Sequence, residues 1–574
     1  MKRSIVCLAT AAAGLAGAPA IHAAPPKAGA DLILTHARVY TVDAKHPWAE
    51  AIAIRKGKII AVGSNAAVVR QKGRSTRVVD LHGRLVLPAF GDAHVHPVFG
   101  GMTYSRCSLR AGKTLEDYHS IIRGCITKTP GTGAVFGVGW EDSLFPPNGV
   151  PRKEELDKVS TDRPLIFRSL GGHSLWLNSK ALALIGITKD TPDPPNGKID
   201  RDAATGDPVG GLEEAAMGLA DPFIPPPSSQ EMQDAIIYMA KYANSIGITD
   251  WHDAGVEYTA AGRSPTLDAY AAVRDQGKLT SHVSIALKWQ NEHGLEQLPG
   301  LFRASDYGRR LGLHANAVKF YVDGVIPQKT AAMLEPYEGS SERGTPEIAP
   351  ALLKEAVTRV VGHNMQPHFH VIGDGAVREA LDAVEAAERA HPAADPRPML
   401  SHLNVVDPAD VARFGKLGAA AILQPLWASE YPYMRLMETA IGPNRSKSIY
   451  PAKSILNTGG MLAYGSDWPV ASANPLEGIE VALTRTTHAG PDFEPLLPQE
   501  DVTLREAIKA YTLNVAYVNH FEKMTGSITI GKSADLIVLD QDIFKLVPAK
   551  ISDAKVLVTM FEGREVFGQL EGTR

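Results

Sequence analysis

The sequence predicts an α/β fold: a (β/α)8 TIM barrel with a small β-sandwich domain built from N- and C-terminal segments. Segments that alternate apolar and polar residues stand near both ends of the chain, as half-buried strands do. The long middle alternates apolar strands with helical stretches, which is typical of a parallel sheet with helical crossovers. Histidines and acidic residues end several of these strands, where barrels carry their active sites.

The outer segments are rich in β-branched residues and are separated by turns, so each predicts short strands. The simplest arrangement packs the two groups together. We therefore expect one composite β-sandwich from residues 25–89 and 525–574. Its strand patterns are ADLILTHARVYTVD, AIAIRKGKIIAVGS and STRVVDLHGRLVLPAF near the start, and GSITIGKSADLIVLD and AKVLVTMFEGREVFG near the end.

Residues 90–524 are expected to form the barrel, with about nine candidate strands against the eight that the fold requires. The stretch at about 103–221 is rich in Gly, Pro and charged residues and predicts an insertion in an early βα loop. The candidate strands are the one ending at His94 and PLIFRSLGGH, ITDWHDAG, SHVSIALKW, ANAVKFYVDG, MQPHFHVIGDG, PMLSHLNVV, AAILQP and MLAYGSDWPV.

Residues 1–24 predict a secretory signal peptide: basic residues at positions 2 and 3, a short apolar stretch, then small residues. We therefore expect a secreted or periplasmic protein. The alternative is that the segment stays uncleaved as an N-terminal anchor. No later stretch reaches the roughly 18 apolar residues of a membrane span.

Cys7 lies in the leader. Cys107 and Cys125 remain, either as a disulfide or as two buried thiols.

The composition is globular, with 44% hydrophobic and 21% charged residues among 574. The formal net charge is −4, and the sequence carries no run of Lys and Arg and no RNA-binding motif. These features exclude nucleic acid as the expected partner and favour a small-molecule substrate.

The segment VLPAFGDAHVHPVFGG ends an apolar strand with His94 and His96, which alternation places on one face. Other predicted strands end in similar groups, and Lys319 lies inside an apolar strand, where an unpaired charge is costly. Any one of them alone is more often structural. Together, imidazoles and carboxylates at one barrel end predict a site for Zn²⁺ or a related divalent ion. The further strand-end residues are Asp323, His368, His370, His402 and Asp467.

This constellation resembles the amidohydrolase superfamily, specifically the YtcJ-like branch called amidohydrolase family 3. The resemblance covers nearly the whole mature chain and implies metal-dependent hydrolysis, mostly of C–N bonds in amides or cyclic amides. The motifs that carry it are LPAFGDAHVHP, GHSLWLNSKAL, GITDWHDAG, VKFYVDG, HVIGDGA, SHLNVV and GSDWPVASANPLEGI, with the flanking β-sandwich.

The resemblance also implies a ligand set. Lys319, carboxylated on its amine by CO₂, would bridge two Zn²⁺ ions; some members of the superfamily bind a single metal. His370, rather than His368, matches the fifth-strand ligand. The full implied set is His94, His96, Lys319, His370, His402 and Asp467.

Five further residues are candidates near the substrate. His173 matches a family position and either donates a hydrogen bond to the substrate or fastens the insertion to the barrel. Trp140 and Trp176 either line the pocket or pack in a core. Asp323 is expected to contact substrate. Glu214 also matches a family position, and a solvated helix charge is its default interpretation.

The function implied is hydrolysis of an N-substituted amide by metal-activated water, with Asp467 as the base and His173 polarising the carbonyl. An esterase, lactonase or carbamate hydrolase on the same site is the alternative, because loops set the substrate. Lys319 argues against a deaminase. A non-catalytic periplasmic binding protein is the alternative from another class. A homodimer is expected from the family.

Overall fold

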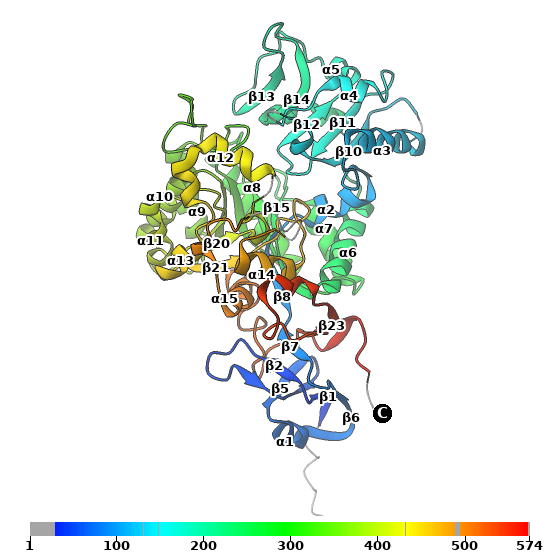
Figure 1. Ribbon diagram of the computed structural model, residues 1–574, viewed down its shortest axis with the longest axis vertical. Helices are drawn as coiled ribbons and strands as arrows, with labels where there is room; N and C mark the ends of the chain where they lie inside the picture. The colour runs from blue at the N-terminus through cyan, green and yellow to red at the C-terminus, as the bar shows by residue number, and fades with distance from the viewer. Residues whose placement is uncertain are drawn as a thin grey trace, which may run out of the picture.

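The computed structural model describes residues 29–129, 131–146, 149–224, 226–430, 432–487 and 494–571. Figure 1 shows three parts along the long axis: a β-rich part at the bottom, the barrel in the middle and a second β-rich part at the top. The expected signal peptide, 1–24, lies outside the described residues. No helix in the described ranges is long and apolar enough to cross a membrane.

The bottom part is a composite of both chain ends. A four-stranded sheet, β5-β4-β1-β6, faces a six-stranded sheet, β24-β23-β22-β7-β2-β3. Leu34, Ile52, Val86, Leu536 and Met560 come from both sheets and share one buried core. Its elements are β1 (Ala30–Thr35), β2 (Arg38–Tyr40), β3 (Trp48–Ala49), β4 (Ala51–Arg55), β5 (Lys58–Gly63), α1 (Asn65–Val68), β6 (Lys72–Asp80), β7 (Leu85–Pro88), β22 (Leu536–Leu539), β23 (Val556–Phe561) and β24 (Arg564–Phe567).

The middle part is an eight-stranded parallel barrel, and the predicted fold class is confirmed. Each strand pairs with the next along the chain, and the near-continuous burial of these strands is typical of a sheet covered on both sides. The strands are β8 (Phe90–Val95), β15 (Ile248–Val256), β16 (His282–Lys288), β17 (His314–Tyr321), β18 (Gln366–Val371), β19 (Met399–His402), β20 (Ala420–Leu423) and β21 (Met461–Tyr464).

Helices surround the barrel, and short sequence signals begin several of them. Ser228 and Glu231 form a capping box at the start of α6, and Thr503 and Glu506 form another at α15. The helices are α2 (Pro97–Ser105), α6 (Ser229–Ser245), α7 (Pro265–Asp275), α8 (Leu298–Arg310), α9 (Pro350–Gly362), α10 (Asp374–Ala390), α11 (Pro408–Lys416), α12 (Pro432–Arg445), α13 (Ala452–Asn457), α14 (Pro475–Thr484), α15 (Leu504–Ala510) and α16 (Leu513–Val518).

The top part lies between the first and second barrel strands in sequence and contains its own six-stranded sheet, β13-β14-β12-β11-β10-β9. PLIFRSLGGH was one of the nine candidate barrel strands, and that assignment is wrong: it forms β11 of this sheet. The elements are β9 (Cys107–Ser108), α3 (Leu115–Lys128), β10 (Val135–Trp140), α4 (Lys153–Asp157), β11 (Leu165–Ser169), β12 (Ser174–Leu177), α5 (Ser179–Ile185), β13 (Gly197–Arg201) and β14 (Pro208–Glu214).

A disulfide joins Cys107 to Cys125, and so resolves the alternative that the sequence left open. It links β9 to α3 within the top part.

The exact domain boundaries stay a prediction, but the direction of the barrel strands follows from the chain path. β7 ends in the bottom part at Pro88 and β8 begins at Phe90, so the carboxyl ends of the barrel strands point toward the top part.

Candidate active site

The barrel closes where its first and eighth strands meet. The main chain after β21 pairs with β8 through a parallel bridge between Val95 and Trp468. His96 N donates to Trp468 O at 2.9 Å, and Asp467 N donates to His94 O at 2.8 Å. The buried Asp92 carboxylate accepts the amide and hydroxyl hydrogens of Ser466 and so joins the same strands. Closure therefore brings residues 374 positions apart in the sequence to one point.

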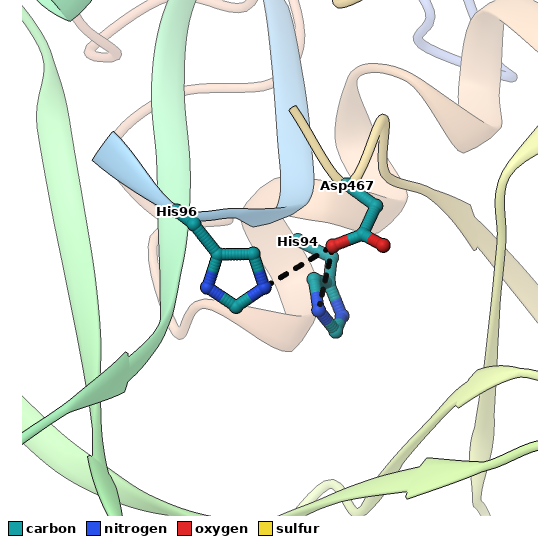
Figure 2. Close-up of side chains that lie close together, drawn as sticks. All are labelled: His94, His96 and Asp467. Atoms are coloured by element: carbon teal, nitrogen blue, oxygen red, sulfur yellow. Dashed lines mark ion pairs between the residues drawn. The ribbon is translucent and has the colours of Figure 1, made fainter. Parts of the chain in front are cut away.

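At this point His94, His96 and Asp467 converge, as Figure 2 shows. Asp467 Oδ1 lies 3.1 Å from His96 Nε2 and 3.4 Å from His94 Nε2. One ligand atom from each residue fits within a mutual distance of 4.8 Å, so these three groups could hold a metal ion. His96 keeps 21% of its side chain exposed, whereas His94 is fully buried. The site is thus open on the His96 side.

Lys319 reaches the same point from the fourth barrel strand, β17. Its Nζ lies 3.1 Å from His94 Nε2, and the side chain is fully buried. Burial lowers the pKa of the Lys319 amine to about 7, against the opposing charges of Asp467 and Asp253. A large part of this amine is therefore neutral near pH 7, which is uncommon for lysine.

His370 and His402 complete the group from the fifth and sixth strands. Their ring centroids are 4.6 Å apart, and the His402 ring lies 4.8 Å from that of His94. His402 Nδ1 is 3.0 Å from Gln424 Oε1, so this nitrogen carries the hydrogen and Nε2 keeps its lone pair. The structure thus brings the six predicted ligands to one barrel end.

Two of these positions have an unusual backbone. His402 has a φ of 81° and Asp467 a φ of 57°, in the left-handed region that non-glycine residues seldom adopt. Each residue ends or follows a barrel strand, at the point where the chain must turn its side chain inward. Such strain persists where the surrounding structure holds it, and it is concentrated at functional sites.

Electrostatics keeps His94, His370 and His402 neutral. Burial, followed by the neighbouring cationic groups, holds the pKa of His94 and of His370 well below the usual value. Burial likewise lowers the pKa of His402 to about 3. Burial opposes ionisation of Asp467, but its hydrogen bond with His96 and nearby charges keep its pKa below the usual value. The site therefore offers neutral imidazoles and an anionic carboxylate.

His173 reaches the site from the top part. It stands in the turn between β11 and β12, and its ring centroid is 5.3 Å from that of His370. Its Nδ1 lies 3.0 Å from Glu214 Oε2. Burial acts against the charge, but Glu214 prevails and raises the pKa of His173 to about 9. His173 is therefore a cation at neutral pH, held at the edge of a group of neutral histidines.

Glu214 is not the solvated helix charge that was its default interpretation. It ends β14 with a φ of 48°, and 9% of its side chain is exposed. Besides His173, its carboxylate accepts a hydrogen bond from Thr330 Oγ1 of the barrel. It therefore ties the top part to the barrel while fixing the charge of His173. The pattern GGLEEAAMG in an insertion gives no sign of this pairing.

Three predicted substrate contacts are not placed at the site opening. Trp140 and Trp176 are fully buried in the core of the top part, and their indole N–H groups donate to Phe167 O and Arg152 O. Asp323 is fully buried, and its oxygens accept three backbone N–H groups, from Ala332, Ile372 and Gly373. The polar atoms of these three side chains thus have hydrogen-bond partners within the protein. Asp323 orders the loop that follows His370 instead of facing a substrate.

Two further buried histidines lie beside the predicted ligands: His368, which the sequence placed at a strand end without a role, and His252, which sequence reasoning missed. His368 Nε2 lies 3.2 Å from His94 Nδ1, and His368 Nδ1 lies 3.1 Å from His252 Nε2. The signal for His368 was present, because HFH repeats the spacing of HVH on an inward-facing strand. His252, in ITDWHDAG, stands alone in its strand.

The donor set fits a divalent metal. Neutral imidazoles offer lone pairs, a carboxylate offers negative charge, and a buried lysine of low pKa is open to modification. Imidazole with carboxylate suits zinc and its neighbours in the first transition row.

Comparison with known proteins agrees with this geometry. The amidohydrolase family matches residues 77–567. The putative amidohydrolase YtcJ of Bacillus subtilis is 28% identical over 542 residues, 92% of this chain and 98% of its own length. The N-substituted formamide deformylase of Arthrobacter pascens is 28% identical over 559 residues, 93% of this chain and 97% of its own.

Among solved structures, an uncharacterised metal-dependent hydrolase from Pyrococcus furiosus has the same fold. Its TM-score is 0.68 at 24% identity, and the match covers 90% of this chain and 100% of that one. The family match spans most of the chain, from the bottom part through the barrel and back. This chain therefore belongs to the amidohydrolase family and is a hydrolase that acts on C–N bonds, with a possible metal site at His94, His96 and Asp467.

Proposed function

We propose that this protein is an exported hydrolase that cleaves the non-peptide C–N bond of an N-substituted amide, using two zinc ions. The observation that carries the proposal is the meeting of neutral imidazoles, the Asp467 carboxylate and a buried amine at one barrel end, with cationic His173 beside them. The deformylase relative supports the choice of an N-substituted amide.

Six residues would hold the metals: His94, His96, Lys319, His370, His402 and Asp467. When bound, the ions supply Lewis acidity, which polarises a carbonyl and makes water nucleophilic near neutral pH. The neutral fraction of Lys319 can add to CO₂: the N–C bond forms, the amine loses one proton, and the product is a carbamate anion. This anion removes the cost of a buried lone ammonium and can contact two cations.

Asp467 is the proton carrier of the proposal. Its carboxylate is anionic and lies within reach of the open His96 side. It accepts one proton from the attacking water as the C–O bond forms. It then delivers that proton to the leaving nitrogen as the C–N bond breaks. His173 donates a hydrogen bond from Nε2 to the carbonyl oxygen, because Glu214 occupies its Nδ1.

Export is part of the proposal. The leader at 1–24 has the order of a signal peptide, and a disulfide joins Cys107 to Cys125, as is usual in oxidising compartments. Cell fractionation and the N-terminal sequence of the mature protein test export. A homodimer is proposed from the family alone, and light scattering of the mature protein tests it.

Metal content and a substrate panel test the activity. The mature chain, produced with zinc and bicarbonate, is expected to hold two zinc ions and to hydrolyse N-substituted formamides and acetamides. Matched esters, lactones and carbamates should react more slowly. His96→Asn should lose zinc and activity, whereas His293→Asn, at an exposed histidine, should keep both. Preference for the esters, or zinc-free protein that keeps full activity, would contradict the proposal.

A further inference from the structure

A line of buried polar side chains leaves the active site and runs through the barrel interior. Its members are buried, with at most 3% of any residue exposed, and the proposed reaction uses none beyond His94. We call them the buried relay: His94, Ser401, His368, His252, Asn519 and Asp250.

The relay is continuous by distance. Ser401 Oγ lies 2.9 Å from His94 Nδ1 and 2.7 Å from His368 Nε2. His94 Nδ1 also approaches His368 Nε2 directly, at 3.2 Å. His368 Nδ1 lies 3.1 Å from His252 Nε2. Each ring therefore uses one nitrogen toward the site and the other away from it.

The far end of the relay is an amide and a carboxylate. His252 Nδ1 lies 3.0 Å from Asn519 Oδ1, and Asn519 Nδ2 donates to Asp250 Oδ1 at 2.9 Å. Asn519 follows α16, at the end of the barrel nearer the bottom part, far from the metal ligands in sequence. A carboxylate accepts hydrogen bonds and an amide nitrogen donates them, so Asp250 sets which way the Asn519 amide points.

This end decides the direction of every bond in the relay. Asn519 Oδ1 can only accept, so His252 carries its hydrogen on Nδ1 and presents a lone pair at Nε2. His368 Nδ1 must then donate, which leaves a lone pair on His368 Nε2. Ser401 Oγ donates to that lone pair and accepts from His94 Nδ1. His94 therefore carries its hydrogen on Nδ1, and its Nε2 is left with a lone pair.

That lone pair faces the active site. His94 Nε2 lies 3.4 Å from Asp467 Oδ1 and 3.1 Å from Lys319 Nζ, in the group that could hold a metal. Reversing every bond of the relay would put a hydrogen on Nε2 and block coordination. Removing a partner that fixes the tautomer of a histidine ligand commonly weakens metal binding.

We propose that the buried relay, anchored by Asp250 and Asn519, holds His94 in the tautomer that binds metal. Asn519 and Asp250 are thus positioning residues that act on His94 through the rest of the relay. The inference rests on the proposed function, because it needs His94 to be a metal ligand.

The test measures zinc affinity in the metal-free mature protein by competition with a chelator. Asn519→Leu removes the amide at similar volume and should weaken zinc binding by about 10- to 100-fold. Asn514→Leu is the matched control: Asn514 is buried in α16 and donates to Leu462 O, outside the relay. It should bind zinc within a few-fold of the wild type.

Asn519→Asp separates direction from packing. An aspartate keeps an oxygen that accepts from His252 Nδ1, so it should bind zinc more tightly than Asn519→Leu even if it is less stable. A purely structural role predicts instead that affinity follows melting temperature in all three variants. That result, or wild-type affinity in Asn519→Leu, would overturn the relay.

A milder pair decides the question if Asn519→Leu does not fold. Ser401→Ala removes the hydroxyl that lies between His94 and His368, so zinc binding should weaken. The loss should be only several-fold, because His94 Nδ1 still approaches His368 Nε2 directly. Ser284→Ala is its control, since Ser284 Oγ is buried in β16 without a hydrogen-bond partner among the described residues. Equal affinity in this pair would contradict the relay. Wild-type protein without zinc affinity would contradict the proposed function itself.

Discussion

The barrel and the top part both bring histidines to one site, yet they give them opposite charge. Burial makes His370 and His402 neutral in the barrel, whereas Glu214 raises the pKa of His173 to about 9 in the top part. The rings of His173 and His370 are only 5.3 Å apart. Burial opposes the charge of each ring, and only at His173 does a close carboxylate, Glu214 at 3.0 Å from Nδ1, outweigh it. Neutral rings can bind a cation, and a cationic ring can donate a proton or a hydrogen bond.

The largest expected effect comes from replacing Asp467, whose carboxylate lies beside the barrel histidines. Asp467→Asn should lower kcat by about 10³-fold, because the amide cannot accept a proton, while the histidines keep most of the zinc. Steady-state kinetics and metal analysis on the same sample measure this. Turnover near the wild-type rate would remove Asp467 from the role of base.

Lys319→Ala tests the neutral amine of the barrel. It should lower both zinc affinity and kcat/KM by about 10²-fold, of the order of other groups that support a metal site. Added formate or acetate should restore part of the activity by supplying a carboxylate in the space left. A variant with full zinc and full activity would exclude a bridging carbamate.

Glu214→Gln tests the cationic side of the comparison. Without the carboxylate, the pKa of His173 should fall from about 9 toward its usual value near 6.5. A raised pKa favours the protonated form of His173 in the folded protein. The stability that its pairing with Glu214 contributes is therefore complete below pH 6.5 and is lost as pH rises through 9. In the variant, activity should decline at lower pH than in the wild type, with kcat about 10-fold lower at pH 8.

Zinc content should stay unchanged in Glu214→Gln, since the carboxylate pairs with His173 and Thr330 rather than with the predicted ligands. The pH profile of kcat/KM makes the measurement. An unshifted alkaline limb would mean that His173 does not act as the donor.

The smallest effect is expected inside the top part. Trp140→Phe should change kcat/KM by less than about twofold, because Trp140 is fully buried away from the barrel histidines. It should lower the free energy of unfolding by about 1–3 kcal/mol, since Phe167 O loses its N–H partner. Thermal unfolding with parallel kinetics tests this. A marked change in KM would return Trp140 to the substrate pocket.

Local sequence already carried the part of the site that depends on strand ends. His94, His96, His402 and Asp467 lie at or just after the ends of apolar strands, and the rule that barrel sites lie at the carboxyl ends places them together. The composite β-sandwich was equally accessible, because alternation marks strands wherever they occur. Periodicity could not assign PLIFRSLGGH to the right sheet, since a buried strand looks alike in a barrel and in an insertion.

The sequence by itself determined the fold class, the family and the residue types gathered at the site, because these depend on periodicity and on motifs next to strands. The tertiary structure decided which groups are paired. It placed Glu214 against His173, joined Cys107 to Cys125, and paired the oxygens of Asp323 with backbone N–H groups through hydrogen bonds. Charge state and tautomer depend on neighbours distant in sequence, because the energy of a buried proton is set by what lies within a few ångströms of it.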